Sequence, residues 1–388
     1  MDVIVIGGGA SGLFSAIFAA KSNNKVTIIE CDKNVGTKIN ITGNGKCNLT
    51  NLNMNSTKYY GNAEFIDNVL AQFNEKDTIN FFENLGVMIY ENNGYVYPLS
   101  NQATTISNIL RDYATELGVK IKTNNVINSV KKINKKFHVD IGTDLECDKL
   151  IIATGGLSGV NNEYSKLGYK IASDFGHKIV TLKPALTSLV CEKSSLNSAA
   201  GVRVVSNVTI HINKKITSEK GEIQITNYGV SGIPIFNISS MCEKGTKLEI
   251  DFMPDYNSDM IYKIISGQNG SIGKIISRFL NEKLALAILD KVHINKNINV
   301  KDLDSNTILN IINKIKFFDL IVIKNGGYNH SQVTKGGVCT FEIDPNSMES
   351  RLVPGLYFAG EIIDVDGMCG GYNLQFAWST GYIAGRDF

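Results

Sequence analysis

The sequence lacks the cysteine spacings that indicate a disulfide framework or a zinc site. Its seven cysteines are odd in number and scattered along 388 residues, and none forms a C-x-x-C pair. Reduced thiols of this kind are typical of the cytoplasm, where we expect the protein to be located. The five histidines show no metal-ligand spacing, so the sequence predicts no metal site.

Long hydrophobic runs and an excess of one charge are absent as well. No segment approaches the roughly 18 apolar residues of a membrane span, and the start MDVIVIGGG is not typical of a signal peptide. Thirty-nine Lys and Arg against 37 Asp and Glu leave a formal charge of +2. This balance does not favour nucleic acid or an anionic membrane as a partner, so we expect a small-molecule substrate. No pattern indicates the oligomeric state.

What the sequence does contain is a nucleotide-binding pattern at its N-terminus. The buried strand VIVI is followed by the turn GGGASG, a helical pattern that runs to about Lys21, and a second buried strand, VTIIE. Strand, glycine turn, helix and strand within about 30 residues make a βαβ unit. A G-x-G-x-x-G turn in this context predicts dinucleotide binding.

The glycines and the acid of this unit have distinct physical roles. Gly7 permits the tight turn, Gly9 lets the backbone approach a pyrophosphate, and Gly12 lets the helix pack closely on the strand. Free N–H groups at the helix N-terminus favour an anion. Glu30 ends the second strand and can accept both ribose hydroxyls, which disfavours a 2′-phosphate. The predicted contacts in the turn are Gly7, Gly9, Ala10, Ser11 and Gly12.

The C-terminal segment VPGLYFAGEIIDVDGMCGGYNLQFAWSTG makes FAD the expected dinucleotide. Its buried strand ends at Gly360 and Glu361, where an acid and backbone N–H groups suit the ribityl chain of a flavin. A helix then begins near Tyr372, and its N-terminus would stabilise the anion of reduced flavin. Another buried strand delivers Thr154 and Gly155 to the same cofactor. No second fingerprint follows a strand, so we expect no separate NAD(P)H domain.

Together these motifs resemble the BaiN/aminoacetone-oxidase-like family of bacterial FAD flavoproteins. The resemblance covers essentially the whole chain and is carried by DVIVIGGGASGL, GTKINITGNGKCNLTN, QVTKGGV and the C-terminal segment. It implies an α/β fold in which a Rossmann-like FAD-binding domain is interrupted by a β-rich, barrel-like domain and a small helical domain. The sequence texture places these over 1–185 and 338–388, over 186–256 and 318–337, and over 257–317.

In this family the loop at 36–51 wraps the FAD. Glycines 43 and 45 allow positive φ and close approach of the backbone. Lys46 stands where the family commonly has Arg, and it lacks the bidentate geometry of Arg. We interpret Cys47 as a small buried filler rather than a redox-active thiol, since no resolving cysteine lies nearby in the sequence. Besides the turn and Glu30, the resemblance implies these FAD contacts: Lys38, Thr42, Asn44, Gly45, Lys46, Cys47, Asn48, Val126, Thr154, Gly155, Gly360, Glu361, Asp366, Gly371, Tyr372, Asn373 and Leu374.

The resemblance implies an FAD-dependent oxidoreductase in which non-covalent FAD carries a hydride at N5. We expect reduction of an activated C=C in an enone-like substrate, with NAD(P)H as transient electron donor. Oxidation of a small aminoketone such as aminoacetone, yielding hydrogen peroxide, is the competing activity in the family. A redox sensor without turnover and an NAD-dependent dehydrogenase are alternatives of other classes.

No residue stands out in the sequence as a catalytic acid or base. Thr334 in QVTKGGV is a candidate to reach a substrate carbonyl, although this segment is equally typical of a bulged strand between domains. We therefore name Thr334 as the one catalytic candidate.

Overall fold

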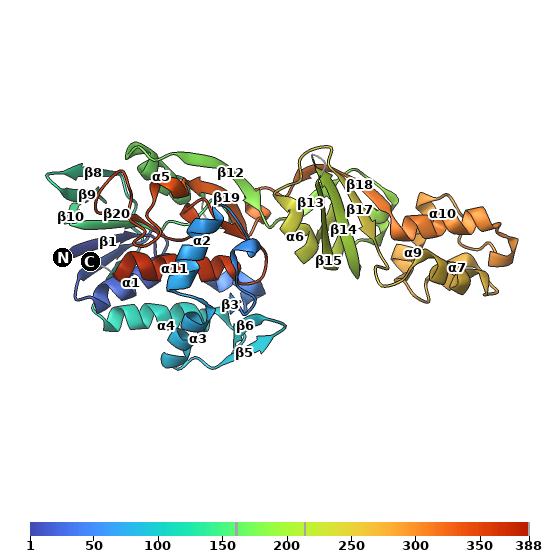
Figure 1. Ribbon diagram of the computed structural model, residues 1–388, viewed down its shortest axis with the longest axis horizontal. Coiled ribbons are helices and arrows are strands. Elements are labelled where there is room, and N and C mark those ends of the chain that lie inside the picture. Colours follow the sequence, from blue (N-terminus) through green and yellow to red (C-terminus); the bar gives the residue numbers. More distant parts are fainter. Residues whose placement is uncertain (160–161, 213–214, 387–388) are drawn as a thin grey trace. The chain divides into compact units, whose positions relative to one another are not determined.

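The computed structural model describes residues 1–159, 162–212 and 215–386, and the chain divides into two compact units (Figure 1). Unit 1 consists of Met1–Lys183 and Val333–Phe388, and unit 2 is Pro184–Gln332. The N-terminal and C-terminal motifs therefore belong to the same unit. None of the described helices is long and apolar enough to cross a membrane.

Unit 1 is built on a five-stranded parallel sheet whose register joins the two ends of the chain. Ile6 pairs with Ile29 on one side and Ile152 on the other, and Ile152 pairs with Phe358. All five carboxyl ends therefore lie at one edge, where open α/β sheets bind ligands. The strand order is β20 (Leu356–Phe358), β11 (Lys149–Ile152), β1 (Asp2–Ile6), β2 (Lys25–Ile29) and β7 (Lys120–Lys122).

The first and last helices, α1 (Ala10–Lys21) and α11 (Tyr372–Arg386), lie side by side (Figure 1). The rings of Phe14 and Trp378 meet there with centroids 4.7 Å apart. Because α1 packs between the sheet and α11, it is buried on most of its circumference. The other helices of this unit are α2 (Ala63–Gln72), α3 (Glu75–Asn84), α4 (Ala103–Glu116) and α5 (Asn162–Asp174).

Small sheets complete unit 1. One is a meander of three strands, another joins the end of the loop at 36–51 to a hairpin, and two are single pairs. They are β8 (Ser129–Ile133), β9 (Lys136–Asp140) and β10 (Asp144–Cys147); β3 (Thr50–Asn51), β6 (Tyr95–Pro98) and β5 (Ile89–Asn92); β12 (Ile179–Ala185) with β19 (Val333–Val338); and β4 (Tyr59–Tyr60) with β21 (Asp366–Gly367).

Unit 2 combines a closed antiparallel barrel with helices around one hydrophobic core. That core joins barrel residues such as Ile250 to helical residues such as Ile288. The predicted fold class is confirmed, whereas the domain boundaries stay a prediction. The barrel order is β13 (Leu189–Cys191), β16 (Gly229–Gly232), β15 (Lys215–Thr226), β14 (Arg203–Ile212), β17 (Lys247–Asp251) and β18 (Phe318–Asn325), and the helices are α6 (Ile233–Ser239), α7 (Ser258–Ser266), α8 (Ile272–Ile276), α9 (Glu282–Lys291) and α10 (Ser305–Lys316).

Candidate functional site

The turn between β1 and α1 is shaped by its glycines. Gly7 has a φ of +102°, and a Cβ there would lie 2.5 Å from the Ala153 carbonyl oxygen. A Cβ on Gly12 would overlap the carbonyl oxygen of Gly7, so only glycine lets α1 pack this closely. A Cβ on Gly9, by contrast, would meet no atom within 4 Å. Because α1 begins at Ala10 without a side-chain cap, its first N–H groups and this open space form a cradle suited to an anion.

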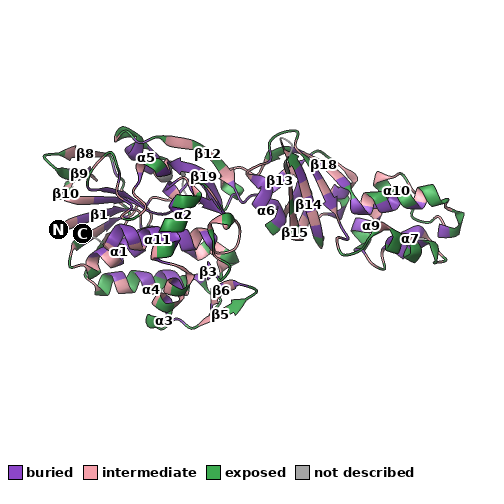
Figure 2. Cartoon of the chain, viewed as in Figure 1, coloured by how far each residue is buried: buried purple, intermediate pink, exposed green. Residues whose placement is uncertain are grey.

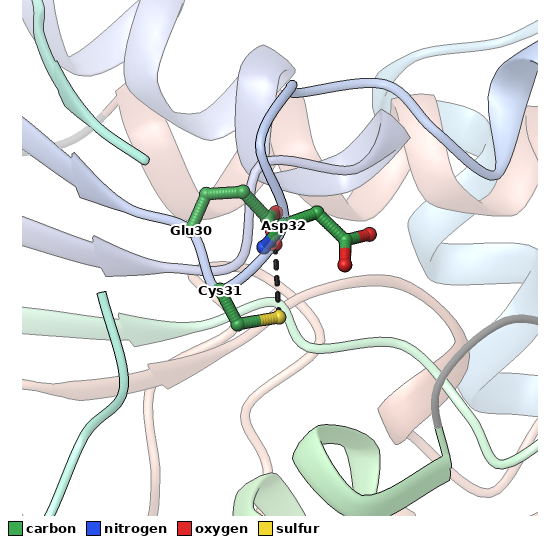
Figure 3. A group of neighbouring side chains, drawn as sticks. All are labelled: Glu30, Cys31 and Asp32. Carbon is green, nitrogen blue, oxygen red and sulfur yellow. Dashed lines mark hydrogen bonds between the residues drawn. The ribbon is translucent and has the colours of Figure 1, made fainter. Parts of the chain in front are cut away.

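Glu30 follows β2 and accepts hydrogen bonds from the turn and from its own loop. Figure 3 shows it with its loop neighbours Cys31 and Asp32. Its Oε2 accepts from the backbone N–H of Gly8 at 2.6 Å, and its Oε1 accepts from Asp32 N at 2.9 Å and Cys31 Sγ at 3.1 Å. The ligand atoms of these three neighbouring side chains lie within 4.8 Å, as in a metal site. Without a metal ion, burial and the bond to Glu30 raise the pKa of the Cys31 thiol to about 12, so the thiol is a protonated donor. Glu30 thus lies beside the glycine turn, and its role at the ribose of a nucleotide stays a prediction.

Three further predicted contacts follow two strands of the parallel sheet, β11 and β7. Thr154 follows β11, and its buried Oγ1 has no hydrogen-bond partner among the described residues. A Cβ on Gly155, whose φ is +71°, would meet nothing within 4 Å. Val126 lies beyond β7 with its side chain 48% exposed, next to Asn125, whose N–H binds the Glu30 carbonyl oxygen at 3.0 Å. An unpaired buried hydroxyl is costly, so this edge fits FAD, which would supply a partner.

Glu361, beyond β20, joins three segments of the site. Its Oε2 lies 2.6 Å from Lys38 Nζ, and its Oε1 accepts the backbone N–H of Thr334 at 2.8 Å. The Oγ1 of Thr334 accepts the N–H of Ser158 at 3.1 Å, and its side chain is fully buried. The structure therefore brings Lys38 and Glu361 together with the catalytic candidate Thr334, and it engages Thr334 in positioning this acid.

Gly360 lies after β20 and in close contact with α1. It has a φ of +80°, and a Cβ there would overlap the Ser11 hydroxyl. The Gly360 N–H donates to Thr380 Oγ1 at 2.9 Å, and Ser11 Oγ donates to the Ala359 carbonyl oxygen at 3.1 Å. The Ser11 side chain thus bonds to the C-terminal strand instead of capping its own helix.

The loop at 36–51 contains five residues with positive φ. Gly36 opens the loop with a φ of +76°, and four more lie close together: Gly43, Asn44, Gly45 and Cys47, with φ values of +56°, +56°, +81° and +58°. The Cys47 side chain is fully buried, and burial raises the pKa of its thiol to about 12. Such a neutral thiol suits the interpretation of Cys47 as a filler.

Of the other predicted residues of this loop, two form hydrogen bonds within the protein and two are exposed. Thr42 Oγ1 donates to the Ile39 carbonyl oxygen at 2.7 Å, which fastens the loop to itself. Asn48 is buried and accepts the Val96 N–H at 3.3 Å. The side chains of Asn44 and Lys46 are exposed.

Helix α11 fastens this loop from the opposite end of the chain. Gln375 Oε1 accepts hydrogen bonds from Thr50 Oγ1 at 2.6 Å and Thr78 Oγ1 at 2.8 Å. The indole N–H of Trp378 donates to the Leu49 carbonyl oxygen at 3.0 Å. All of these groups are buried, so each bond lost leaves an unsatisfied polar atom. The Gln and Trp of the C-terminal motif therefore support the loop.

The segment before α11 is closed by Asn373. Its Oδ1 accepts the Gly367 N–H at 2.8 Å, and its Nδ2 donates to the Gly367 carbonyl oxygen at 2.8 Å. A Cβ on Gly371 would lie 2.7 Å from the Thr50 carbonyl oxygen. Tyr372 is buried and Leu374 is partly buried in the first turn of α11. The backbone of this turn is therefore the part available to a flavin.

Asp366 is the buried acid of this segment, with 3% of its surface exposed. Burial raises its pKa to about 7, the nearby Lys335 ammonium opposes that shift, and Asp364 adds to it. Lys335 Nζ lies 4.5 Å from the ring centroid of Tyr60, which pairs with Asp366 between β4 and β21. A carboxyl with this pKa exchanges a proton near neutral pH, as acid–base groups do.

The hairpin β5–β6 borders the site but was not predicted from the sequence. The N–H of Leu49 donates to the Val96 carbonyl oxygen at 2.8 Å, which joins the hairpin to the loop at 36–51. Its turn residues, Asn93 and Gly94, have φ values of +53° and +87°. Asn-Gly between strand-forming residues is the usual signal of such a turn and was available in NNGYVYP.

Comparison with known proteins gives matches along the whole chain. The chain is 37% identical over 398 aligned positions to the 3-dehydro-bile acid delta(4,6)-reductase of Clostridium scindens, covering 98% of this chain and 97% of that protein. It is 32% identical over 400 positions to the ribosomal RNA dihydrouridine synthase of Escherichia coli, covering 100% and 97%.

Structural comparison finds a similar fold in a distantly related protein. The 3-ketosteroid delta1-dehydrogenase of Sterolibacterium denitrificans matches with a TM-score of 0.53 and 12% identity, covering 99% of this chain and 98% of that one. The family described as "HI0933-like protein Rossmann domain" matches residues 1–387, which confirms the family predicted from the motifs. The chain therefore belongs to the HI0933-like Rossmann family, and it is an FAD-dependent oxidoreductase.

Proposed function

We propose that the protein reduces a carbon–carbon double bond conjugated to a carbonyl group, with electrons from NAD(P)H. The observation that carries the proposal is the 37% identity with the bile-acid delta(4,6)-reductase over nearly the full length of both chains. That match extends through the barrel and helices of unit 2, so it is more than a likeness of cofactor motifs.

Bound FAD would supply hydride from its N5 to the conjugated double bond. The chain's own residues hold and orient that cofactor. The cradle at Gly9 and the N-terminus of α1 suit the pyrophosphate, and Glu30 suits the ribose. The N-terminus of α11 suits the negative charge of a reduced flavin. Lys38 neutralises the Glu361 carboxylate beyond the end of β20.

Reduction of uridine in RNA is a second candidate, favoured by two specific observations. Relatives at 32% and 29% identity, from Escherichia coli and Haemophilus influenzae, are named ribosomal RNA dihydrouridine synthases. Uridine also carries a double bond conjugated to a carbonyl. In Pro184–Gln332, Lys and Arg number 17 against 13 Asp and Glu, so the inserted unit is the more basic part of the chain. The expectation of no nucleic-acid partner stays a prediction.

Aminoketone oxidation and a redox sensor are the remaining candidates. None of the relatives named above is named for either activity. Both stay alternatives with distinct experimental outcomes: hydrogen peroxide formation for the oxidase, and absence of turnover for the sensor.

The proposal is tested by a single turnover of the anaerobically reduced protein. The reduced protein is mixed separately with a 3-oxo steroid carrying delta(4,6) double bonds, with a uridine-containing ribosomal RNA fragment, and with oxygen. The proposal expects the steroid to reoxidise the flavin and to lose one double bond per flavin. Reoxidation by the RNA alone would favour the second candidate, and reoxidation by oxygen alone, with peroxide, would favour the oxidase. Protein stripped of FAD is the control.

A further inference from the structure

The hairpin β5–β6 presents an aromatic face beside the cofactor site. Tyr90 lies directly opposite Tyr97, with ring centroids 5.7 Å apart and ring planes 25° apart. Tyr95 shares this face because side chains alternate along a strand, while Val96 and Pro98 are buried on the other face. The three tyrosines form a row that we call the tyrosine platform. All three are half-buried, and β5 contains only half-buried and exposed residues (Figure 2).

Two hydroxyls of the tyrosine platform are free to bind a ligand. Tyr90 Oη donates to Asn101 Oδ1 at 2.6 Å. In the part of the chain that the structure describes, the hydroxyls of Tyr95 and Tyr97 form no hydrogen bond. Burial raises the pKa of both phenols, so they remain neutral donors at physiological pH. Ring faces with free donors at their edge suit a planar ligand that carries an acceptor.

The tyrosine platform adjoins both loops that we assign to the flavin. A Cβ on Gly370 would lie 3.1 Å from the ring of Tyr95, and a Cβ on Gly43 would lie 3.7 Å from the ring of Tyr97. Gly370 precedes α11, and Gly43 belongs to the loop at 36–51. Glycine at both positions leaves the rings uncovered where they meet the predicted cofactor edge.

We propose that Tyr95 and Tyr97 bind the carbonyl-bearing ring of the substrate. Their rings stack on its conjugated atoms, and a phenol hydroxyl donates a hydrogen bond to its carbonyl oxygen. This inference rests on the proposed function, because a double bond conjugated to a carbonyl is planar and ends in an acceptor. The hydrogen bond stabilises negative charge that develops on the carbonyl oxygen as hydride adds to the far end of the double bond. A 3-oxo steroid and a uracil base share this chemistry.

Binding to the oxidised holoprotein tests the inference without turnover. The probes, measured by equilibrium dialysis, are the delta(4,6) 3-oxo steroid and a uridine oligonucleotide. Tyr95→Phe and Tyr97→Phe keep the rings but remove the donors, and the variant that loses the bond should bind roughly fivefold more weakly. Tyr97→Leu also removes a ring and should weaken binding by roughly 10- to 100-fold. Tyr228→Phe, at an exposed position of unit 2, is the matched control and should bind as the wild type does.

The outcomes separate this inference from the proposed function. The role proposed for the tyrosine platform is wrong if the wild type binds neither the steroid nor the uridine oligonucleotide. It is also wrong if all three platform variants bind the preferred probe as tightly as the wild type does. If the three variants bind as the wild type does and still reduce the preferred probe, the proposed function stands without the platform. If the variants lose binding but the wild type reduces neither ring, the platform stands and the proposed function fails. The FAD content and circular dichroism of each variant establish that it is folded.

Discussion

Lys38 and Glu361 form an ion pair of 2.6 Å across 323 residues of sequence, where the two ends of the chain meet at the carboxyl edge of the parallel sheet. The pair connects the glycine-rich loop at 36–51 to the end of β20. Both side chains are partly shielded from water, with 33% and 17% of their surfaces exposed. Such a pair positions a loop more than it stabilises the fold.

Replacing Lys38 should therefore weaken FAD binding more than it weakens folding. Lys38→Met removes the ion pair and a positive charge near the predicted pyrophosphate, and we expect FAD affinity to fall roughly tenfold. Lys25→Met, which breaks an exposed 3.1 Å pair with Asp2, is the matched control. Titration of the apoprotein with FAD, followed by flavin fluorescence, measures both variants. Equal affinities for the two variants would contradict the role given to Lys38.

Gly9 and Gly12 should differ in what their replacement destroys. A Cβ on Gly9 enters open space, so Gly9→Ala should leave the apoprotein folded but reduce FAD binding. A Cβ on Gly12 overlaps the Gly7 carbonyl oxygen, so Gly12→Ala should destabilise the fold by roughly 2–4 kcal/mol. Thermal unfolding of the two apoproteins measures their stability, and titration of each apoprotein with FAD measures its cofactor binding. The account fails here if Gly9→Ala lowers the melting temperature as far as Gly12→Ala does.

Gln375 should be essential to the loop rather than to the chemistry. Gln375→Leu leaves the buried hydroxyls of Thr50 and Thr78 without their hydrogen-bond acceptor. We therefore expect the free energy of unfolding to fall by about 2–4 kcal/mol. Gln102→Leu, at an exposed position, should change it by less than about 0.5 kcal/mol. Urea unfolding of both variants gives the comparison. A Gln375→Leu protein as stable as the control would contradict the bonding described.

His177 should make the protein sensitive to mild acid. Its Nδ1 lies 3.1 Å from Glu342 and its Nε2 lies 2.8 Å from Ser350 Oγ. The His177 side chain itself is fully buried. Burial lowers the pKa of this imidazole, although Glu342 opposes the shift. The unfolded chain therefore binds the extra proton first, and stability falls as the pH drops below about 6.5, the ordinary value of histidine.

The histidine prediction is checked by melting temperatures between pH 5 and pH 8. His177→Gln should flatten the loss of stability on the acid side, whereas His211→Gln, at an exposed position, should leave the profile unchanged. If the melting temperature of the His177→Gln protein falls as much at acid pH as that of the wild type, groups other than His177 cause the loss of stability.

Titration of Asp366 should lower the stability of the protein as the pH rises, which is opposite to the effect of His177. Its pKa is raised to about 7, so the folded protein keeps a proton that the unfolded chain releases near 3.8. The stability from this group is fully present below the unfolded value and is lost as the pH rises through about 7. Asp366→Asn should stabilise the apoprotein more at pH 8 than at pH 5, by up to roughly 3 kcal/mol. A gain independent of pH would show that the carboxyl of Asp366 does not titrate in this range.

The shape of the N-terminal turn can be predicted from the sequence because its signals are local. Gly7, Gly12 and Glu30 lie within one βαβ unit, and spacing alone defines their roles. The role of Gln375 depends on Thr50 and Thr78, which approach it only when the first and last helices pack together. No short-range pattern encodes such a contact.

The tyrosine platform is a second feature that the sequence alone does not predict. Asn93-Gly94 signals the turn, but the strands on either side have only four residues each. That Tyr90 stacks on Tyr97 follows from the hairpin register, and that Tyr95 borders the cofactor loops follows from tertiary packing. Composition shows fifteen tyrosines without indicating which of them share a face.

The central claim is tested most directly by the flavin spectrum of the anaerobically reduced protein after mixing with the delta(4,6) 3-oxo steroid. We predict that the flavin is reoxidised without oxygen and that one steroid double bond disappears per flavin. A flavin that stays reduced with the steroid and with uridine-containing RNA, and is reoxidised only by oxygen with release of hydrogen peroxide, would contradict the account.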